Sequence, residues 1–234
     1  MSARATLPRI VIVTGTDTGV GKTVVTAALA AALAAAGRTV AAYKPVQTGI
    51  GPGGQDDDGM PEDMAVVARL AGVPTAQGCR LRAPMAPRQA AVEQSAALPT
   101  LSAHVATIED LAASHDHVLV EGAGGLLVQL TDAGEDLRDL ADALVEVAAT
   151  GFVVVARSGL GTLNHTALTL ESLAARGLPL VGVALGCVPP TPSRTEELNH
   201  AHLAPDVVAT VPAGASALAP ATFRAATPDW WSVP

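Results

Sequence analysis

Apolar residues along the chain form two patterns, which alternate from one end to the other. Short continuous runs rich in β-branched residues predict buried strands at 10–13, 39–43, 117–120, 152–156, 180–185 and 207–211. Between them, apolar residues spaced three or four apart predict helices at 24–36, 64–71, 102–113, 137–148 and from 161 to a stop at Gly177. Continuous apolar strands alternating with helices predict an α/β fold in a single domain, with a parallel sheet covered on both faces.

Several segments lack either pattern and are expected to be irregular. Residues 1–7 and about 222–234 are expected to be loose tails of the single domain, which spans 1–234. The stretch 79–99 contains three prolines and predicts a loop with at most short helices. Residues 50–61 contain glycines, prolines and the triplet Asp56, Asp57 and Asp58, a composition that indicates a mobile surface connection.

A glycine-rich turn stands between the first expected strand and the first expected helix. It reads Gly15-Thr16-Asp17-Thr18-Gly19-Val20-Gly21-Lys22-Thr23, with one residue more between Gly15 and Gly21 than the usual phosphate-loop spacing. Such a loop directs backbone N–H groups and a helix N-terminus at phosphate oxygens, while its lysine adds charge and its hydroxyl can ligate Mg²⁺. The alternative, a chance Gly-Lys-Thr in a surface turn, does not explain the flanking strand and helix.

Four polar segments directly follow expected strands, so they should meet at one edge of the sheet. They are the glycine loop, the segment that begins at Lys44, Glu121, and the segment Gly161 to Asn164. Glu121 is placed where a magnesium-associated carboxylate is expected, although it could instead be an N-cap or a structural acid. Lys44 could neutralise charge in a phosphoryl transfer, or could be an ordinary lysine at a strand end.

The composition limits the partners and the cellular setting. A net charge of −8 disfavours nonspecific binding to DNA or to an anionic membrane surface. Cys79 and Cys187 fit no metal spacing, which favours two reduced thiols in a cytoplasmic protein over a structural disulfide. The N-terminus does not resemble a signal peptide, and no apolar stretch is long enough to span a bilayer. The histidines His104, His115 and His117 are expected at the surface, and His165 is expected to be structural.

Together these segments resemble the dethiobiotin synthase family. The resemblance rests on Thr14 to Thr23, on Lys44-Pro45-Val46-Gln47-Thr48-Gly49, on Val120-Glu121-Gly122-Ala123-Gly124-Gly125, and on Leu160-Gly161-Thr162-Leu163-Asn164-His165. They occur in the family's order, extend from about Val11 to about Val188, and include the longer phosphate loop.

The resemblance implies an ATP-dependent ligase of biotin biosynthesis that joins 7,8-diaminononanoate and CO₂ into dethiobiotin, releasing ADP and phosphate. A substrate amine traps CO₂ as a carbamate, the carbamate attacks the γ-phosphate, and the second amine closes the ring of the mixed anhydride. The family is dimeric, and the Gly161 to Asn164 segment would receive the substrate carboxylate across the subunit interface.

The resemblance also assigns roles to individual residues. The catalytic residues would be Lys22, Lys44 and Thr18. Nucleotide contacts would come from Asp17, Thr18, Gly19, Val20, Gly21, Lys22, Thr23, Val24, Glu121 and Gly124. Substrate contacts would come from Thr18, Lys44, Thr48, Glu121, Gly122, Gly161, Thr162 and Asn164. Magnesium would bind Thr23, Glu121 and Asp63; Asp63 is preferred to Asp57 because it directly precedes a helix, where the family places its metal-linked aspartate.

Two departures from the family pattern concern specificity. Gly186-Cys187 replaces the Asn-Asp of members that select adenine, so nucleoside triphosphates other than ATP are also expected to serve. Ala86-Pro87-Arg88 replaces a Ser-Pro-His element of the substrate region.

Two other functions fit parts of the sequence. A partner-regulated switch ATPase of the partitioning or cell-division type shares the architecture. Such proteins usually carry a lysine early in the phosphate loop, where this chain has Thr16 and Asp17, and often add a terminal helix for DNA or membrane. A noncatalytic binding module would not need Lys22, Thr23, Lys44 and Glu121.

Overall fold

The computed structural model describes residues 7–51, 53–55, 59 and 61–232. Its strands are β1 Ile10–Gly15, β2 Val40–Gln47, β3 Thr75–Arg80, β4 His117–Gly125, β5 Thr150–Ala156, β6 Leu180–Val188 and β7 Val207–Pro212. Its α-helices are α1 Lys22–Ala35, α2 Asp63–Ala71, α3 Pro87–Glu93, α4 Leu101–Ser114, α5 Leu137–Leu144, α6 Thr162–Ala174, α7 Arg194–Leu203 and α8 Pro220–Ala226. Two 3₁₀ turns, Ala215–Ala217 and Thr227–Trp230, lie beside α8 in the sequence.

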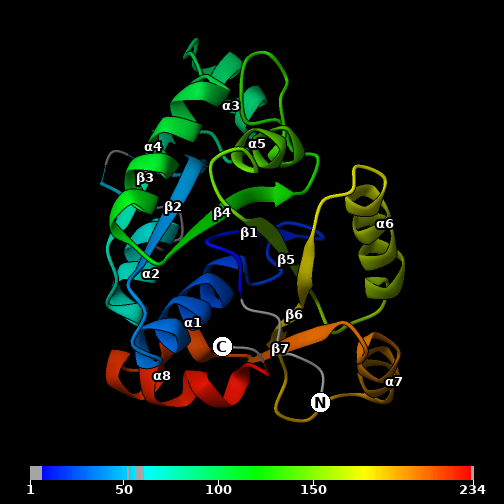
Figure 1. Cartoon of the computed structure of the whole chain (residues 1–234). Coiled ribbons are helices and arrows are strands. Elements are labelled where there is room, and N and C mark those ends of the chain that lie inside the picture. Colours follow the sequence, from blue (N-terminus) through cyan, green and yellow to red (C-terminus); the bar gives the residue numbers. More distant parts are fainter. Residues whose placement is uncertain (1–6, 52, 56–58, 60, 233–234) are drawn as a thin grey trace.

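The strands form one sheet in the order β3-β2-β4-β1-β5-β6-β7, and each neighbouring pair is parallel (Figure 1). The α/β fold predicted from the hydrophobic pattern is therefore confirmed. β1 lies in the middle, so the loop that follows it is flanked by the ends of β4 and β5. That position places the glycine loop at the centre of the carboxyl edge, where ligands bind in sheets of this kind.

Two apolar clusters cover opposite faces of the sheet. On β1, Val11 and Val13 belong to the cluster that includes residues of α1, α2 and α8, whereas Ile10 and Ile12 belong to the cluster that includes residues of α4 and α5. The alternation follows from the period of two in a strand. Because both faces are covered, β1 consists of buried residues along its whole length, which explains the continuous apolar run in the sequence.

Helix α1 is buried on most of its circumference, which explains its lack of a polar face. Every residue from Val25 to Leu33 is buried, because α1 lies between the sheet on one side and α2 and α8 on the other (Figure 1). Alanine suits this position, since it favours helix and allows close approach of neighbouring elements.

The second strand is longer than its pattern predicts, and a third strand was missed. β2 continues past Pro45 to Gln47 and pairs there with β3 alone, because its pairing with β4 ends at Tyr43. Proline is tolerated in a strand where no partner needs its N–H. The start of the expected 79–99 loop belongs to β3, an edge strand of half-exposed residues without the apolar run that marks a buried strand. Its later part contains α3, a short helix as expected.

The prediction of a loose C-terminal tail is wrong for the described part of that segment. Residues 220–230 are helical, and Trp231 forms a bridge with Ala209 of β7. Phe223 and Trp231 are buried, and the rings of Phe223 and Trp230 meet edge to face at 5.2 Å. Large aromatic side chains anchor a segment through the area that they bury. At the other end, Leu7 packs against the core, while residues 1–6 of the expected tail lie outside the described residues.

Candidate active site

The glycine loop has the backbone geometry of a phosphate-binding loop. Gly19 and Gly21 have φ values of 72° and 96°, in the left-handed region that favours glycine. A Cβ on Gly15 would come within 2.9 Å of both the Asp17 carbonyl oxygen and the Val20 side chain, so the curl of the loop requires glycine there as well. Helix α1 begins at Lys22 without a side-chain cap, which leaves its first N–H groups free for an anion.

Lys22 folds back over this loop. Its Nζ donates to the carbonyl oxygen of Asp17 at 2.9 Å, and only 8% of the residue is exposed. Burial lowers the pKa of Lys22 to about 8, although the carboxylate of Glu121 opposes the effect. A buried ammonium with one carbonyl partner would gain strongly from phosphate oxygens.

Lys44 lies between two carboxylates next to the phosphate loop. Its Nζ is 2.5 Å from Oδ2 of Asp63 and 2.9 Å from Oε1 of Glu121, and the same Oε1 accepts a hydrogen bond from the Thr23 hydroxyl at 3.0 Å. The four residues come from α1, β2, α2 and β4. The structure thus brings together the glycine loop, Lys44 and Glu121, three of the four segments that the strand-end argument placed at one edge, and adds Asp63 from the start of α2.

The charges in this cluster are strongly coupled because it is buried. Burial alone would lower the pKa of Lys44, but Glu121 and Asp63 raise it, so the ammonium stays charged. Burial alone would raise the pKa of Asp63, but the Lys44 ammonium brings it below the ordinary value. Burial raises the pKa of Glu121, and Lys44 offsets this only in part.

The oxygen atoms of the cluster fit a magnesium ion. Oε2 of Glu121 is buried and has no hydrogen-bond partner among the described residues, so one carboxylate oxygen is available. Together with the Thr23 hydroxyl and Asp63 it supplies the hard oxygen donors that Mg²⁺ prefers. No group of three or more His, Cys, Asp or Glu side chains suited to a metal occurs in the described part of the chain, so phosphate and water would complete the shell.

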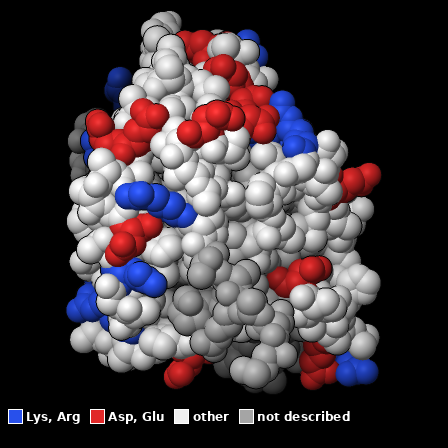
Figure 2. Space-filling model, in the orientation of Figure 1, with Lys and Arg blue, Asp and Glu red and all other residues white. Residues whose placement is uncertain are grey.

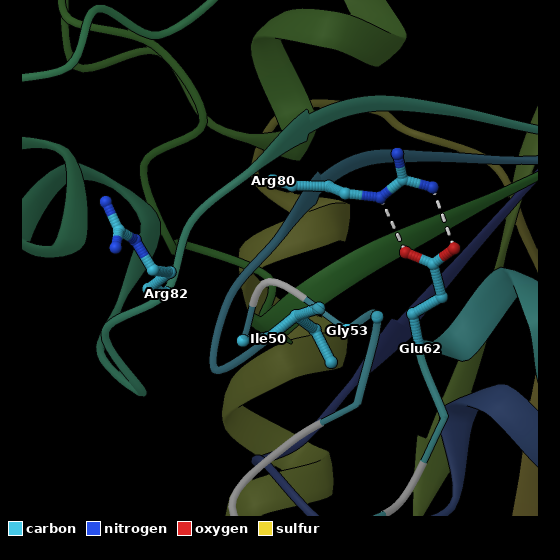
Figure 3. A pocket seen from close by; sticks show the side chains of 7 residues that line it. Ile50, Gly53, Glu62, Arg80 and Arg82 are labelled. Atoms are coloured by element: carbon cyan, nitrogen blue, oxygen red, sulfur yellow. Dashed lines mark hydrogen bonds and ion pairs between the residues drawn. The ribbon is translucent and has the colours of Figure 1, made fainter.

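Two contacts that the sequence did not reveal hold Asp63 in place. The Gln47 side chain accepts a hydrogen bond from the backbone N–H of Asp63 at 3.2 Å. Arg80 of β3 binds Glu62 through two hydrogen bonds of 2.6 and 2.7 Å at the start of α2 (Figure 3). Asp63 was expected directly before this helix, but Glu62 is the N-cap residue, and it makes no side-chain cap. Asp63 is instead the first helical residue, with its carboxylate on Lys44.

A cavity of about 630 Å³ lies beside the Arg80–Glu62 pair (Figure 3). It is lined by Ile50, Gly51, Gly53, Gly54, Glu62, Arg80 and Arg82. None of the residues predicted for the site is among them, so the cavity is a neighbour of the site and not the site itself. The alternative ligand Asp57, with Asp56 and Asp58, lies outside the described residues.

The glycines after Glu121 differ in what surrounds them. A Cβ on Gly124 would lie 3.5 Å from the Thr18 hydroxyl, so Gly124 lies against the phosphate loop. A Cβ on Gly122 would lie 2.5 Å from Leu137 of α5, which is a packing reason for glycine there. Thr48, beyond the end of β2, is half-buried, and its carbonyl accepts a hydrogen bond from Gln47.

The Gly161 segment forms the start of α6, again without a side-chain cap. Gly161 has a φ of 91°, Asn164 is exposed, and the hydroxyl of buried Thr162 has no partner among the described residues. Upstream, Arg157 forms an ion pair with Asp17 of the phosphate loop, with the nearest atoms 2.5 Å apart. Sequence reasoning did not single out Arg157, whose partner is 140 residues away.

Gly186 and Cys187 pack directly against the phosphate loop. A Cβ on Gly186 would lie 2.1 Å from the carbonyl oxygen of Val20, and a Cβ on Gly21 would lie 3.1 Å from the Cys187 sulfur. Glycine at 186 is therefore required by packing, independently of any contact with a base.

One expectation for the histidines is wrong. His104 is fully buried on α4, and its Nδ1 lies 2.7 Å from the Tyr43 hydroxyl. Burial lowers the pKa of His104 to about 4, so the ring is neutral at pH 7. His115 and His117 are half-buried, and His165 is exposed beside the start of α6.

Comparisons with known proteins agree with this arrangement. A family model described as an AAA domain matches residues 9–220. The chain is 48% identical to the ATP-dependent dethiobiotin synthetase BioD of Mycobacterium sp. (strain JLS), covering 94% of this chain and 97% of that protein. It is also 48% identical to the BioD of Rhodococcus jostii (strain RHA1), covering 95% and 94%.

Among solved structures, the septum site-determining protein MinD of Pyrococcus horikoshii, complexed with Mg-ADP, has a TM-score of 0.55 and 19% identity, with 97% of this chain and 86% of that chain covered. At that identity the likeness supports the fold alone and does not favour a switch ATPase. The model match and the identity over nearly the whole chain decide the family. The chain belongs to the AAA domain family and, within it, to the ATP-dependent dethiobiotin synthetases.

Proposed function

We propose that this protein is an ATP-dependent dethiobiotin synthetase, a ligase of biotin biosynthesis. It closes the ureido ring of 7,8-diaminononanoate with CO₂ and converts ATP to ADP and phosphate. The observation that carries the proposal is the buried cluster of Lys44, Asp63 and Glu121 against the phosphate loop, in a chain 48% identical to proteins of that name.

The phosphate loop binds the triphosphate. The uncapped first turn of α1 supports phosphate binding by the N–H groups of residues from Asp17 to Val24. Lys22 exchanges the Asp17 carbonyl for the β- and γ-phosphates. Gly124, next to Thr18, lines the same pocket.

The residues that hold Mg²⁺ in this proposal are Thr23, Asp63 and Glu121. The unpartnered oxygen of Glu121 supports this assignment. When bound, the ion neutralises phosphate charge. To hold the ion, Asp63 would give up the ion pair that it forms with Lys44.

Lys44 then faces the reacting groups with a full positive charge. The carbamate of the diamine attacks the γ-phosphate, and charge develops on the transferring phosphoryl oxygens. A fixed ammonium in a buried site stabilises that charge more than one in water would. The second amine attacks the carbonyl carbon of the mixed anhydride, phosphate leaves, and the ring closes.

The diamine lies on the outer side of this cluster. Thr18, Thr48, Gly122 and Glu121 contact its amine end. Its carboxylate binds the start of α6, at Gly161, Thr162 and Asn164, on the other subunit of a homodimer. The uncapped helix start supports carboxylate binding.

We propose that nucleotide choice is loose, because neither Gly186 nor Cys187 carries an amide to read a base. A site without such groups rejects the wrong base weakly. Comparison of kcat/KM for the four triphosphates tests this, and a preference for ATP of about a thousandfold would contradict it.

We further propose that the protein works in the cytoplasm without nucleic-acid or membrane partners. In the described residues, no helix combines the length and the apolarity needed to cross a membrane. Cys79 and Cys187 are free thiols. On the face in Figure 2, acidic side chains gather toward the end of the molecule where α3, α4 and α5 lie.

Isotope incorporation tests the proposed reaction. The purified protein is supplied with 7,8-diaminononanoate, Mg-ATP and ¹³C-bicarbonate, and the product is identified by mass spectrometry. We expect dethiobiotin with one labelled carbon. ATP hydrolysis without labelled dethiobiotin would contradict the proposal and favour a switch ATPase.

A further inference from the structure

Arg157 lies outside the four segments that carry the family resemblance. It links the phosphate loop to the turn that precedes α6. Arg157 directly follows β5, and its guanidinium binds the Asp17 carboxylate, with the nearest atoms 2.5 Å apart. The two strands that precede them are neighbours in the sheet, and the N–H of Thr16 donates to the carbonyl of Val155 at 2.9 Å. The pair therefore follows directly from the parallel register of β1 and β5.

Asp17 makes three polar contacts in and beside the phosphate loop. Its Oδ1 accepts the N–H of Thr18 at 2.7 Å, its carbonyl accepts from Lys22 at 2.9 Å, and its Oδ2 binds Arg157. The Thr18 N–H lowers the pKa of Asp17, and Arg157 and His165 lower it further, so the carboxylate is charged at neutral pH. The two carboxylate oxygens of Asp17 thus join Arg157 to the backbone amide of Thr18.

Arg157 is itself presented by an anchored turn. Buried Asn199 of α7 donates from Nδ2 to the carbonyls of Ser158 and Gly159, at 2.9 and 3.1 Å. Two residues beyond Gly159, Gly161 begins the uncapped start of α6. The same short turn therefore carries both the arginine that holds the phosphate loop and the helix start proposed for the substrate carboxylate.

The alternative is that the ion pair only stabilises the fold. Because both side chains are exposed, the two roles predict different effects of breaking the pair. The side chains of Arg157 and Asp17 are 43% and 51% exposed. Exposed pairs contribute little to stability, so a structural role would leave substrate binding unchanged and move the melting temperature only slightly.

We propose that Arg157 is a positioning residue for the diamine: it fixes Asp17, and through Asp17 it holds Thr18 in the orientation that the amine end of the substrate needs. This inference rests on the proposed contact between Thr18 and the diamine. It predicts an effect on the diamine and none of similar size on the nucleotide, because the remaining loop amides and Lys22 keep their own geometry.

The test measures binding and turnover in a small set of variants. Arg157→Gln, Arg157→Lys, Asp17→Asn and the double variant Arg157→Gln/Asp17→Asn are compared with the control Arg194→Gln. Arg194 lies in another exposed ion pair, with Glu197 on α7, and is 77% exposed. Calorimetry gives the dissociation constants of 7,8-diaminononanoate and ATP, steady-state kinetics give KM and kcat, and thermal melts report folding.

We expect Arg157→Gln to weaken diamine binding about tenfold, with ATP binding within about twofold of wild type and an unchanged melting temperature. Arg157→Lys keeps the charge and should recover most of the loss. The double variant should lose no more than Arg157→Gln alone, since both changes break the same contact. Arg194→Gln should behave as wild type.

Wild-type diamine affinity in Arg157→Gln, or an equal loss of diamine and ATP affinity, would overturn the inference. Thr18→Ala, measured in parallel, separates this from a failure of the proposed function. If Thr18→Ala weakens diamine binding and Arg157→Gln does not, only the role of Arg157 is wrong. If Thr18→Ala leaves diamine binding unchanged, the Thr18 contact itself is wrong and the inference falls with it.

Discussion

Lys44 and Lys22 are both buried lysines beside the phosphate loop, yet their surroundings differ. Lys44 contacts two carboxylates, whereas Lys22 contacts one carbonyl oxygen. Removing Lys44 therefore leaves the buried Glu121 and the half-buried Asp63 without their counter-ion. Removing Lys22 takes away a charge that burial disfavours.

We expect Lys44→Ala and Lys22→Met to abolish ring closure but to change stability in opposite directions. Loss of the ammonium should lower kcat by about a thousandfold in each case. Lys44→Ala should cost about 3–5 kcal/mol of unfolding free energy, the usual cost of breaking a buried pair. Lys22→Met should gain up to about 3 kcal/mol at pH 7, because burial lowers the pKa of Lys22 from its ordinary 10.5 to about 8.

Urea unfolding and a product assay measure the two effects on the same preparations. Equal destabilisation by both substitutions would show that the two charges are equally compensated in the folded protein. Substantial turnover in Lys44→Ala would remove Lys44 from the reaction.

Asp63 is expected to leave Lys44 for magnesium, and its substitution tests that exchange. Asp63→Asn should raise the Mg²⁺ concentration for half-maximal activity about tenfold and lower kcat, because a neutral amide is a weaker ligand. Asp110→Asn, the same change at an exposed position of α4, is the control. A magnesium titration in which both variants match wild type would move the ligand elsewhere, with Asp57 the next candidate.

The residues of the site were largely predictable because their chemistry is local. Residues adjacent in the sequence are enough to identify a glycine loop followed by lysine and threonine, or a glutamate at a strand end. Gln47 and Arg157 were not identified, because their partners Asp63 and Asp17 are distant in sequence and a single glutamine or arginine forms no pattern.

At the scale of the elements, buried strands and long helices followed from periodicity, and weakly patterned elements did not. β3 has an intermediate or exposed residue at every position, so no apolar run marks it. α7 carries charged and polar residues on most of its surface and was also missed. The C-terminal helix is fixed by tertiary contacts of Phe223 and Trp231, which local propensity does not encode.

The contact between β2 and α4 predicts a pH dependence of stability. His104 is neutral against Tyr43, because burial lowers its pKa to about 4; the nearby Glu135 opposes this. The unfolded chain, with a histidine pKa near 6.5, binds a proton that the folded chain rejects between pH 6.5 and 4. Unfolding free energy should therefore fall as the pH drops through this window, by up to about 3 kcal/mol.

His104→Gln isolates this contribution, since glutamine stays neutral and can still pair with the Tyr43 hydroxyl. Unfolding free energies between pH 4 and 7 should decline less steeply in the variant than in wild type. Parallel pH profiles for the two proteins would show that His104 has an ordinary pKa in the folded state.

At the scale of the whole molecule, the start of α6 is proposed to complete the site of the other subunit. Lys22→Ala and Asn164→Ala chains should each be inactive alone, yet a mixed dimer would contain one site with neither change. Random exchange of equal amounts gives half mixed dimers with one intact site in two, or about a quarter of wild-type activity. Absence of rescue after verified subunit exchange would contradict a shared site.

The dependence of nucleotide turnover on the other two substrates distinguishes ring closure from simple ATP hydrolysis. ADP release is followed with Mg-ATP alone, with 7,8-diaminononanoate added, with bicarbonate added in CO₂-depleted buffer, and with both. We predict sustained turnover only when both are present, with one dethiobiotin formed for each ADP, because the carbamate is the group that accepts the γ-phosphate. Turnover of ATP at the same rate without diamine or without bicarbonate would contradict ring closure as the function of this site.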